Sequence, residues 1–324
     1  MSLSCPYLMR LLAVVCFLTM TGRNHAQTAT DSMANDFHGM VARNFSRYRT
    51  VNMYWEMNGA HDYTITANGK EVAKGRKRDL HTIRFSTMVP ILKQRRFSLY
   101  ANVQYAGYVF DCSENLAAIF SEDSYNRYLG GFTASYITTL FKRPLILGAD
   151  IFADGWDGGW GMLQGRIVAA LVLARNRQTA FSLGLAGMTL GRMPVLPVIS
   201  YWHRFSSPHW SIDVTLPSQL YLRYQWGNQR VSTGASMGSD NFYLGVNLPG
   251  IPSVCYYSEA VMKPEMLYEY IINKHFYLSA HIGMNVVMNG ALYTKSRKEP
   301  GMDIELKRSA TPFFNVGVSY SLFK

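Results

Sequence analysis

The chain has 324 residues, of which 48% are hydrophobic and 14% aromatic, and its formal net charge is +11 at pH 7. This composition excludes an intrinsically disordered chain, which would lack the apolar residues needed for a core. The longest apolar run after residue 26 covers residues 167–174, less than half of the ~20 residues that a transmembrane helix requires. If the mature chain enters a membrane, it must therefore cross as strands.

The first 26 residues have the pattern of a cleavable export signal. Arg10 supplies a positive charge, residues 11–20 form a short apolar stretch, and Ala26 is a small residue at a suitable cleavage point. Cys16 does not predict a lipoprotein anchor, because valines precede it where a small residue is needed. We therefore predict a signal peptide over 1–26, a periplasmic segment over 27–47 and one β domain over 48–324.

From residue 51 onward, apolar and polar residues alternate with a period of two over segments of about ten residues. The pattern is clearest in residues 51–57, 97–105, 220–226 and 276–286. In each segment one face is aromatic or aliphatic and the other is polar. Because the alternation recurs with no helical stretch between, it predicts an all-β, up-and-down antiparallel transmembrane barrel.

Short and long connections alternate along the chain. Tight turns are predicted near residues 93–95, 142–144, 175–177, 204–208, 227–229 and 273–274. Longer links are predicted at 59–78, 111–125, 155–162, 238–262 and 289–310, with two short ones near Gly191 and Pro217. A first strand near Tyr48 then gives fourteen strands with both ends in the periplasm, and merging strands near Pro217 and Gln229 would give twelve, so we expect about 12–14 strands.

The polar face of the predicted strands carries charged residues far from the strand ends. A dry sandwich core would not tolerate so many buried ions, whereas a water-filled lumen would. The predicted pore-lining residues are Glu56, Arg84, Asp150, Asp213, Arg223, Glu269 and His281. The alternative is that these charges pair in salt bridges that plug the lumen.

Two cysteines, Cys112 and Cys255, remain after the signal is removed, and both fall in segments predicted as loops on the same side of the membrane. Two cysteines alone fix no geometry, so a disulfide between them and a pair of free thiols stay as alternatives.

Basic residues cluster in the first and last predicted outer links, which are neighbours in a closed barrel. Such clusters either bind anionic lipopolysaccharide or are basic segments that are simply exposed to solvent. The residues are Lys70, Lys74, Arg76, Lys77 and Arg78 in the first link, and Lys295, Arg297, Lys298, Lys307 and Arg308 in the last.

The C-terminal strand is the most specific feature of the sequence. Asn315, Gly317, Tyr320 and Leu322 match the β-signal of outer-membrane proteins, in which a polar residue and a glycine precede two aromatic or apolar residues. An amphipathic edge strand of this kind can pair with the outer-membrane assembly machinery before the barrel closes. The four residues are therefore predicted to form an assembly signal.

The export signal, the aromatic-rich strands and the GVSYSLF ending make the mature chain resemble a group of uncharacterised outer-membrane β-barrel proteins of Bacteroidota. The resemblance implies the barrel fold and a location in the bacterial outer membrane. It assigns no functional residue.

Three functions fit this sequence. The leading hypothesis is a porin-like channel for passive passage of small polar solutes. A structural or adhesive surface protein is the second. The third is a lipid-modifying enzyme that uses Ser279 and His281, which share the lumen face of one strand but lack a third catalytic partner.

We therefore expect no enzymatic activity, no cofactor and no metal site. The expected partners are outer-membrane lipid, lipopolysaccharide and the assembly machinery, and not nucleic acid. The sequence does not determine the oligomeric state.

Overall fold

A computed structural model describes residues 49–113, 124–188, 195–247, 251–273, 275–294 and 304–322. The predicted signal peptide (1–26) and periplasmic segment (27–47) lie outside this part of the chain. Within the described ranges, no helix is long and apolar enough to cross a membrane.

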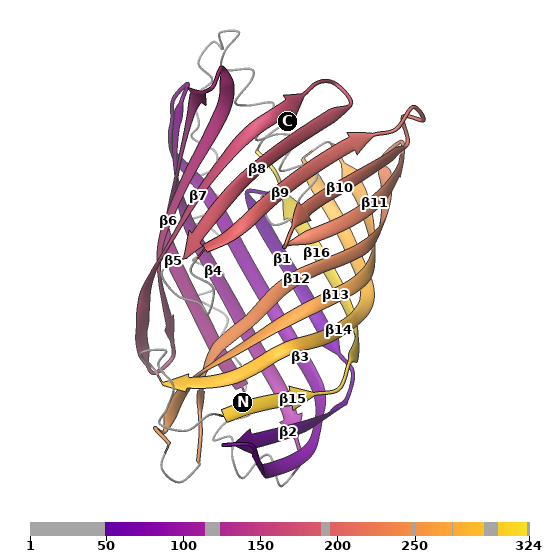
Figure 1. Cartoon of the computed structure of the whole chain (residues 1–324). Helices are drawn as coiled ribbons and strands as arrows, with labels where there is room; N and C mark the ends of the chain where they lie inside the picture. Colours follow the sequence, from indigo (N-terminus) through magenta and orange to yellow (C-terminus); the bar gives the residue numbers. More distant parts are fainter. Residues whose placement is uncertain are drawn as a thin grey trace.

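The described residues form one antiparallel sheet, as the alternating pattern predicts (Figure 1). Its strands are β1 (Val51–Asn58), β2 (His61–Ala67), β3 (Lys70–Lys93), β4 (Phe97–Cys112), β5 (Ser124–Leu140), β6 (Arg143–Trp156), β7 (Gly159–Arg175), β8 (Thr179–Met188), β9 (Val195–Arg204), β10 (Trp210–Leu216), β11 (Gln219–Trp226), β12 (Gln229–Gly245), β13 (Val254–Ile272), β14 (Phe276–Thr294), β15 (Ile304–Arg308) and β16 (Thr311–Tyr320).

The sheet closes on itself because β1 pairs with β16. After a short break, β2 continues β1 and pairs with β15 in the same register, so that Asn58 lies opposite Phe313 and Tyr63 opposite Arg308. Counting β1 with β2 and β15 with β16 as two interrupted strands gives a closed barrel of fourteen strands in the described part of the chain. The predicted all-β barrel and its strand number are confirmed.

All six predicted tight turns lie at one end of the barrel, which we name the turn end. They join β3 to β4, β5 to β6, β7 to β8, β9 to β10, β11 to β12 and β13 to β14. The separate hairpins at residues 217–218 and 227–228 exclude the twelve-strand alternative. The opposite end, which we name the loop end, includes β2 and β15, at the bottom of Figure 1.

Several predicted loops at the loop end are wrong, because the strands extend further than expected. Residues 70–78 belong to β3 and pair with β2 or β4, and β6 and β7 meet in a tight hairpin at residues 157–158. Likewise β12 and β13 remain paired from Gln229 to Gly245. The charged side chains that suggested loops are compatible with strands here, because a sheet that projects beyond lipid exposes them to water.

The outer surface of the barrel is apolar, with aromatic residues at the turn end. Exposed side chains such as Phe132, Ile167 and Ile282 face outward along the strands. At the turn end, the ring centroids of Trp210 and Tyr224 are 4.8 Å apart and those of Phe276 and Tyr320 are 4.7 Å apart. An apolar band with an aromatic girdle is the surface that a lipid bilayer requires.

Residues of the predicted assembly signal form the strand that closes the barrel. Asn315 faces inward opposite Glu56, and the backbone N–H of Leu322 donates to the hydroxyl of Thr50 (3.0 Å). Gly317 lies so close to β1 that a Cβ would be 2.8 Å from the Cβ of Tyr54 and 3.0 Å from the carbonyl oxygen of Met53. Glycine is therefore needed here for close strand packing, and recognition by the assembly machinery stays a prediction.

The wall of the barrel is uneven in height. Strands β8 to β11 contain 10, 10, 7 and 8 residues, whereas β7 contains 17 and β12 to β14 contain 17, 19 and 19. In Figure 1 the short strands occupy only the upper part of the barrel, above β12, β13 and β14. Within the described residues, β7 therefore extends beyond its pairing with β8, and β12 extends beyond its pairing with β11.

Candidate functional site

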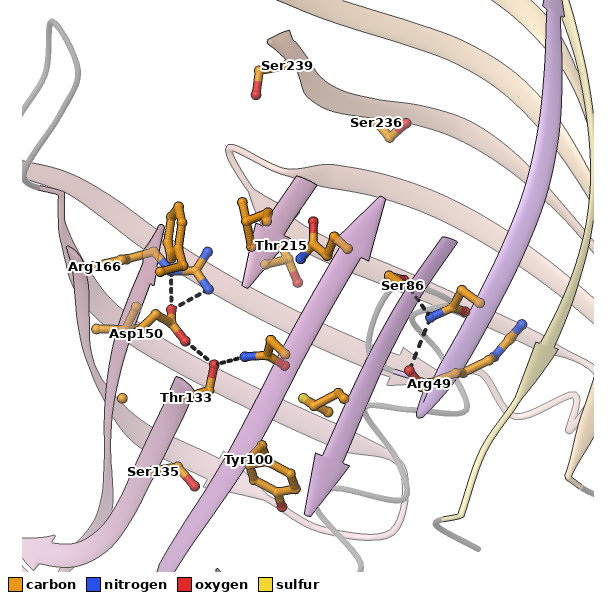
Figure 2. Close-up of a pocket in the computed structure, with 18 of the residues that line it drawn as sticks. Arg49, Ser86, Tyr100, Thr133, Ser135, Asp150, Arg166, Thr215, Ser236 and Ser239 are labelled. Atoms are coloured by element: carbon orange, nitrogen blue, oxygen red, sulfur yellow. Dashed lines mark hydrogen bonds and ion pairs between the residues drawn. The ribbon is translucent and has the colours of Figure 1, made fainter. Parts of the chain in front are cut away.

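A cavity of about 1750 Å³ occupies the lumen of the barrel. Neutral polar side chains cover much of the wall formed by β3, β4, β5, β9 and β10 (Figure 2). Among them are Ser86, Asn102, Thr133, Ser135, Ser200 and Thr215. These hydroxyl and amide groups can donate and accept hydrogen bonds.

A chain of hydrogen bonds links side chains of four neighbouring strands, β4 to β7, and Figure 2 shows it. The side-chain amide of Asn102 donates to the hydroxyl of Thr133 (2.5 Å), and that hydroxyl donates to Asp150. Arg166 completes the chain, with Nε 2.6 Å from Oδ2 of Asp150. Asp150 is therefore a paired carboxylate held at the cavity surface.

Two ion pairs cross the middle of the lumen. Lys263 donates to both carboxylate oxygens of Glu56 (3.0 Å each), and Arg84 donates to Asp240. The amide of Asn315 also reaches Glu56 at 3.5 Å. Each acidic group thus has a basic partner from a different strand.

A buried ionic cluster lies at the turn end. Glu269 accepts from Arg49 and from Arg230, whose Nη2 is 2.5 Å from Oε2 of Glu269. The guanidinium of Arg49 also lies 3.7 Å from the centre of the Tyr277 ring. Nearby, Asp213 and Arg223 form a second buried pair at 2.8 Å. These charges tie the segment before β1 to strands β10 to β13.

His281 belongs to another hydrogen-bond network on the inner face of the barrel. Its Nδ1 lies 2.7 Å from Oε2 of Glu265, which also accepts from the hydroxyls of Tyr221 and Ser236. The hydroxyl of Ser279 instead donates to the carbonyl oxygen of Gly317 (3.4 Å). No hydrogen bond joins Ser279 to His281 in the described structure, so the two are not arranged as a nucleophile and its base.

The structure separates the predicted pore-lining residues into two groups. Glu56, Arg84, Asp150, Asp213 and His281 border the cavity, whereas Arg223 and Glu269 are buried in ion pairs behind its surface. The ionic partners of these residues are not in the predicted set; they are Arg49, Arg166, Arg230, Asp240, Lys263 and Glu265. Most of them lie on the same inward polar face as the predicted set. The period-two alternation could therefore have identified them as lumen residues.

An aromatic and aliphatic core fills the interior near the loop end. The ring of Phe242 packs against Tyr108 and Tyr257, with centroids 4.5 and 4.9 Å apart, and the hydroxyl of Tyr63 donates to that of Tyr257 (2.8 Å). We name this set the loop-end core. Its buried members are Tyr63, Ile65, Ala106, Tyr108, Phe110, Tyr125, Phe242, Leu244, Val246, Cys255, Tyr257, Leu292, Ile304 and Leu306.

Cys255 is a free, buried thiol in the loop-end core. Its Sγ lies 3.4 Å from the carbonyl oxygen of Pro252. Of the two predicted alternatives, the structure therefore has the free thiol at Cys255 and not the disulfide. The side chain of Cys112 lies outside the described part of the structure.

The first and last basic runs are neighbours, as predicted, because β15 pairs with β2 and β2 with β3. Two of their members are not solvated, however. Lys77 is buried with its ammonium 3.5 Å from the centre of the Phe110 ring, and Arg308 is paired with Glu259. Lys74 and Arg76 are exposed. Lys295, Arg297 and Lys298 lie outside the described residues, as does the side chain of Arg78.

A closed antiparallel barrel with an apolar, aromatic-girdled outer surface and an ionic interior defines a class of protein, because only closed strands satisfy their backbone hydrogen bonds in lipid. The chain is an outer-membrane β-barrel protein.

No family model matches the chain, and no curated protein matches it. The chain is similar to three solved structures of different function. An outer-membrane channel of Pseudomonas putida F1 is 11% identical, with a TM-score of 0.38 over 83% of this chain and 95% of that chain. A FadL homologue of Pseudomonas aeruginosa is 10% identical, with a TM-score of 0.33 over 84% and 90%. Outer membrane phospholipase A of Escherichia coli is 10% identical, with a TM-score of 0.31 over 82% and 97%.

Proposed function

We propose that the barrel is a passive, non-catalytic conduit for small solutes that carry polar groups. The observation that supports this proposal is the cavity of about 1750 Å³ with a wall of neutral hydroxyl and amide side chains. Small-molecule sites usually enclose about 300–1,000 Å³, so the lumen has room for a small solute together with water.

The pairing of lumen charges supports a preference for uncharged solutes. Glu56 with Lys263, Arg84 with Asp240, and Asp150 with Arg166 each combine one negative and one positive group. Paired charges at these distances largely cancel each other's field, so neither cations nor anions are strongly favoured. A neutral polar solute would exchange its hydrogen bonds with water for bonds to Ser, Thr and Asn side chains.

The first prediction concerns flux. Liposomes containing the protein should swell in the uncharged pentose arabinose faster than empty liposomes. Ser135→Trp should reduce the swelling rate several-fold, because Ser135 borders the cavity (Figure 2) and an indole would narrow it. Gly130→Trp is the matched control, since a side chain at Gly130 would meet no atom within 4 Å and its neighbours Tyr128 and Phe132 are exposed on the outer surface. Swelling no faster than that of empty liposomes would refute the conduit.

The second prediction concerns ion selectivity. Arg166→Gln should shift the reversal potential in a KCl gradient toward cation selectivity, because the carboxylate of Asp150 would lose its positive partner at the cavity surface. The shift should decrease at high ionic strength, where the unpaired charge is screened. Lys307→Gln is the control, since Lys307 forms an exposed pair with Glu305 on the outer extension of the barrel. An equal shift in both variants would argue against Asp150 as a pore charge.

The second candidate function is a closed structural barrel. The loop-end core favours it, because aromatic side chains occupy the interior where an axial exit would be. The swelling assay separates the two candidates, since a closed barrel would give no flux in the parent protein or in either tryptophan variant.

We propose lipopolysaccharide as a lipid partner at the loop end. Thr64 of β2 lies opposite Lys74 on one side and opposite Lys307 on the other, which places two basic residues on one row of the sheet. Both lysine side chains are exposed. Ammonium groups on the outer surface above an apolar band suit the phosphate groups of an anionic lipid.

A further inference from the structure

Three neighbouring hairpins at the turn end carry positive charge and no negative charge. They join β3 to β4, β5 to β6 and β7 to β8, and they lie side by side because β4 pairs with β5 and β6 pairs with β7. The segments around these turns, residues 86–104, 130–149 and 166–188, contain no Asp or Glu. Among the exposed basic residues of the three turns are Arg95, Arg96, Lys142, Arg143, Arg175 and Arg177.

The middle hairpin presents a phenylalanine in an unfavourable backbone conformation. Leu140 pairs with Arg143, so Phe141 and Lys142 are the two central residues of the turn, with φ of 52° and 61°. Such a turn favours Asn-Gly, and a bulky residue rarely adopts positive φ. In the described structure, the other two non-glycine residues with positive φ are asparagines. Phe141 is also 81% exposed, so neither turn preference nor burial explains it, and the strain points to a function.

We name Phe141 and the six basic residues the turn-end patch. Its cations lie on both sides of the barrel wall. Arg95, Arg96 and Arg175 border the lumen cavity. Arg143 lies on the outer face, because it pairs with Leu140, which is exposed on that face. A bilayer surrounds only the outer face of a barrel, so a ligand that contacts the whole patch must cover the rim of the turn end.

The positive charge of the turn-end patch has no counterpart in the described part of the chain. Within the described residues, none of the six basic side chains belongs to an ion pair. At the turn end, Glu269 and Asp213 already pair with three arginines. Residues 27–48 add no net charge, because they contain two Asp and two Arg. Charge complementarity therefore favours an anionic group supplied by a partner.

The chemistry of the turn-end patch suits a protein that carries carboxylates. Arg and Lys side chains donate hydrogen bonds and accept none, whereas an ionised carboxylate only accepts them. Sugar hydroxyls need acceptors as well as donors, so a glycan matches the basic side chains less well. An exposed aromatic ring among arginines is the combination that is enriched in protein interfaces.

We propose that the turn-end patch is a docking surface for an acidic segment of a periplasmic protein. The tight turns are predicted to face the periplasm, which sets the compartment of the partner. Phe141 would enter an apolar pocket of the partner, and carboxylates would pair with arginines on both sides of the barrel wall. Docking at the rim does not require solute flux through the lumen.

Fluorescence anisotropy tests the docking surface, with the protein in nanodiscs of phosphatidylcholine, a lipid without net charge. The probe is a fluorescein-labelled peptide that repeats Glu-Glu-Leu. Phe141→Ala should weaken its binding about tenfold, equivalent to ~1.4 kcal/mol, although the charge of the protein is unchanged. A Glu-Glu-Ser peptide should bind the parent and this variant equally, because it has no apolar side chain. Arg95→Gln combined with Arg175→Gln should weaken Glu-Glu-Leu binding several-fold and reduce its salt dependence.

Matched controls separate docking from general attraction between charges. Lys74→Gln combined with Lys307→Gln removes two exposed cations from the loop end and should leave the affinity unchanged. Phe314→Ala removes an outward phenylalanine from the lipid-facing surface and should bind like the parent. Equal weakening in the loop-end and turn-end charge variants, or an unchanged affinity in Phe141→Ala, would overturn the proposal.

Photocrosslinking in cells that make the protein identifies the class of partner. The photoreactive amino acid p-benzoylphenylalanine replaces Phe141 and keeps an aromatic ring at the turn, and the crosslinked material is identified by mass spectrometry. We expect a protein attached through a segment rich in Asp and Glu. The same replacement at Phe314 should crosslink lipid. Crosslinks from position 141 to phospholipid alone, or to peptidoglycan alone, would contradict a protein partner, because the bilayer or the cell wall would then cover the turn-end patch.

Discussion

Glu269→Ala is expected to destabilise the barrel by about 3–5 kcal/mol, the usual cost of removing one partner from a buried ion pair. The loss is large because Glu269 is the shared carboxylate of Arg49 and Arg230, and all three side chains are almost fully buried. Without it, the guanidinium groups of Arg49 and Arg230 would lose the carboxylate that they share, and the nearby Asp213 already pairs with Arg223. The segment before β1 would also lose its attachment to β13.

Urea unfolding in liposomes, followed by the heat-modifiable migration of the folded band on gels, measures this change. Glu305→Gln is the matched control, because it also removes one carboxylate from an ion pair, but its partner Lys307 is exposed to solvent. An exposed pair contributes about 0–1 kcal/mol, so the control should unfold near the parent. Equal stability of Glu269→Ala and the control would show that the turn-end cluster is solvated in the membrane.

Phe242→Ala is expected to have the second large effect, because it removes the central ring of the loop-end core. The Phe242 ring contacts Tyr108, Tyr125 and Tyr257, and truncation of a buried Phe costs about 3–5 kcal/mol. The truncation creates space in the loop-end core, which lies on the axial path toward the loop end. Single-channel conductance in planar bilayers should therefore increase together with the loss of stability.

The control for this second effect is Phe314→Ala. Phe314 faces outward on β16, so its removal changes a lipid contact and not the interior. Its conductance should equal that of the parent. If Phe242→Ala lowers stability without changing conductance, the loop-end core is a structural element only.

These two experiments test the opposite ends of the barrel interior. The ionic cluster stabilises the turn end, where it ties β10 to β13 to the segment before β1. The loop-end core occupies the opposite end. Between them lies the cavity.

The sequence was a good predictor of the strands and a weaker one of their ends. The period-two pattern and the turn residues placed all six tight turns, because side-chain alternation and turn chemistry are local properties. The predicted links at 59–78 and 238–262 were largely wrong, because a strand that projects beyond the bilayer has polar residues on its outer face and resembles a loop. Only pairing with a neighbour decides that such a segment is a strand.

For the candidate site, the alternation identified which charges face inward but not how they pair. Glu56 and Lys263 are far apart in the chain, and the curvature of the closed sheet brings them together across the interior. The same is true of Arg84 and Asp240. Register and barrel closure are therefore required to show that the lumen charges form pairs and that Arg223 and Glu269 lie behind the cavity surface.

By itself, the sequence determined that this chain forms an antiparallel barrel with an apolar exterior and an ionic interior, because residue alternation fixes which side chains share a face. Tertiary structure alone decided the free thiol of Cys255, the loop-end core and the pairing of the lumen charges. These features depend on which distant strands meet across the lumen. Such properties arise from long-range pairing and are not contained in any local segment.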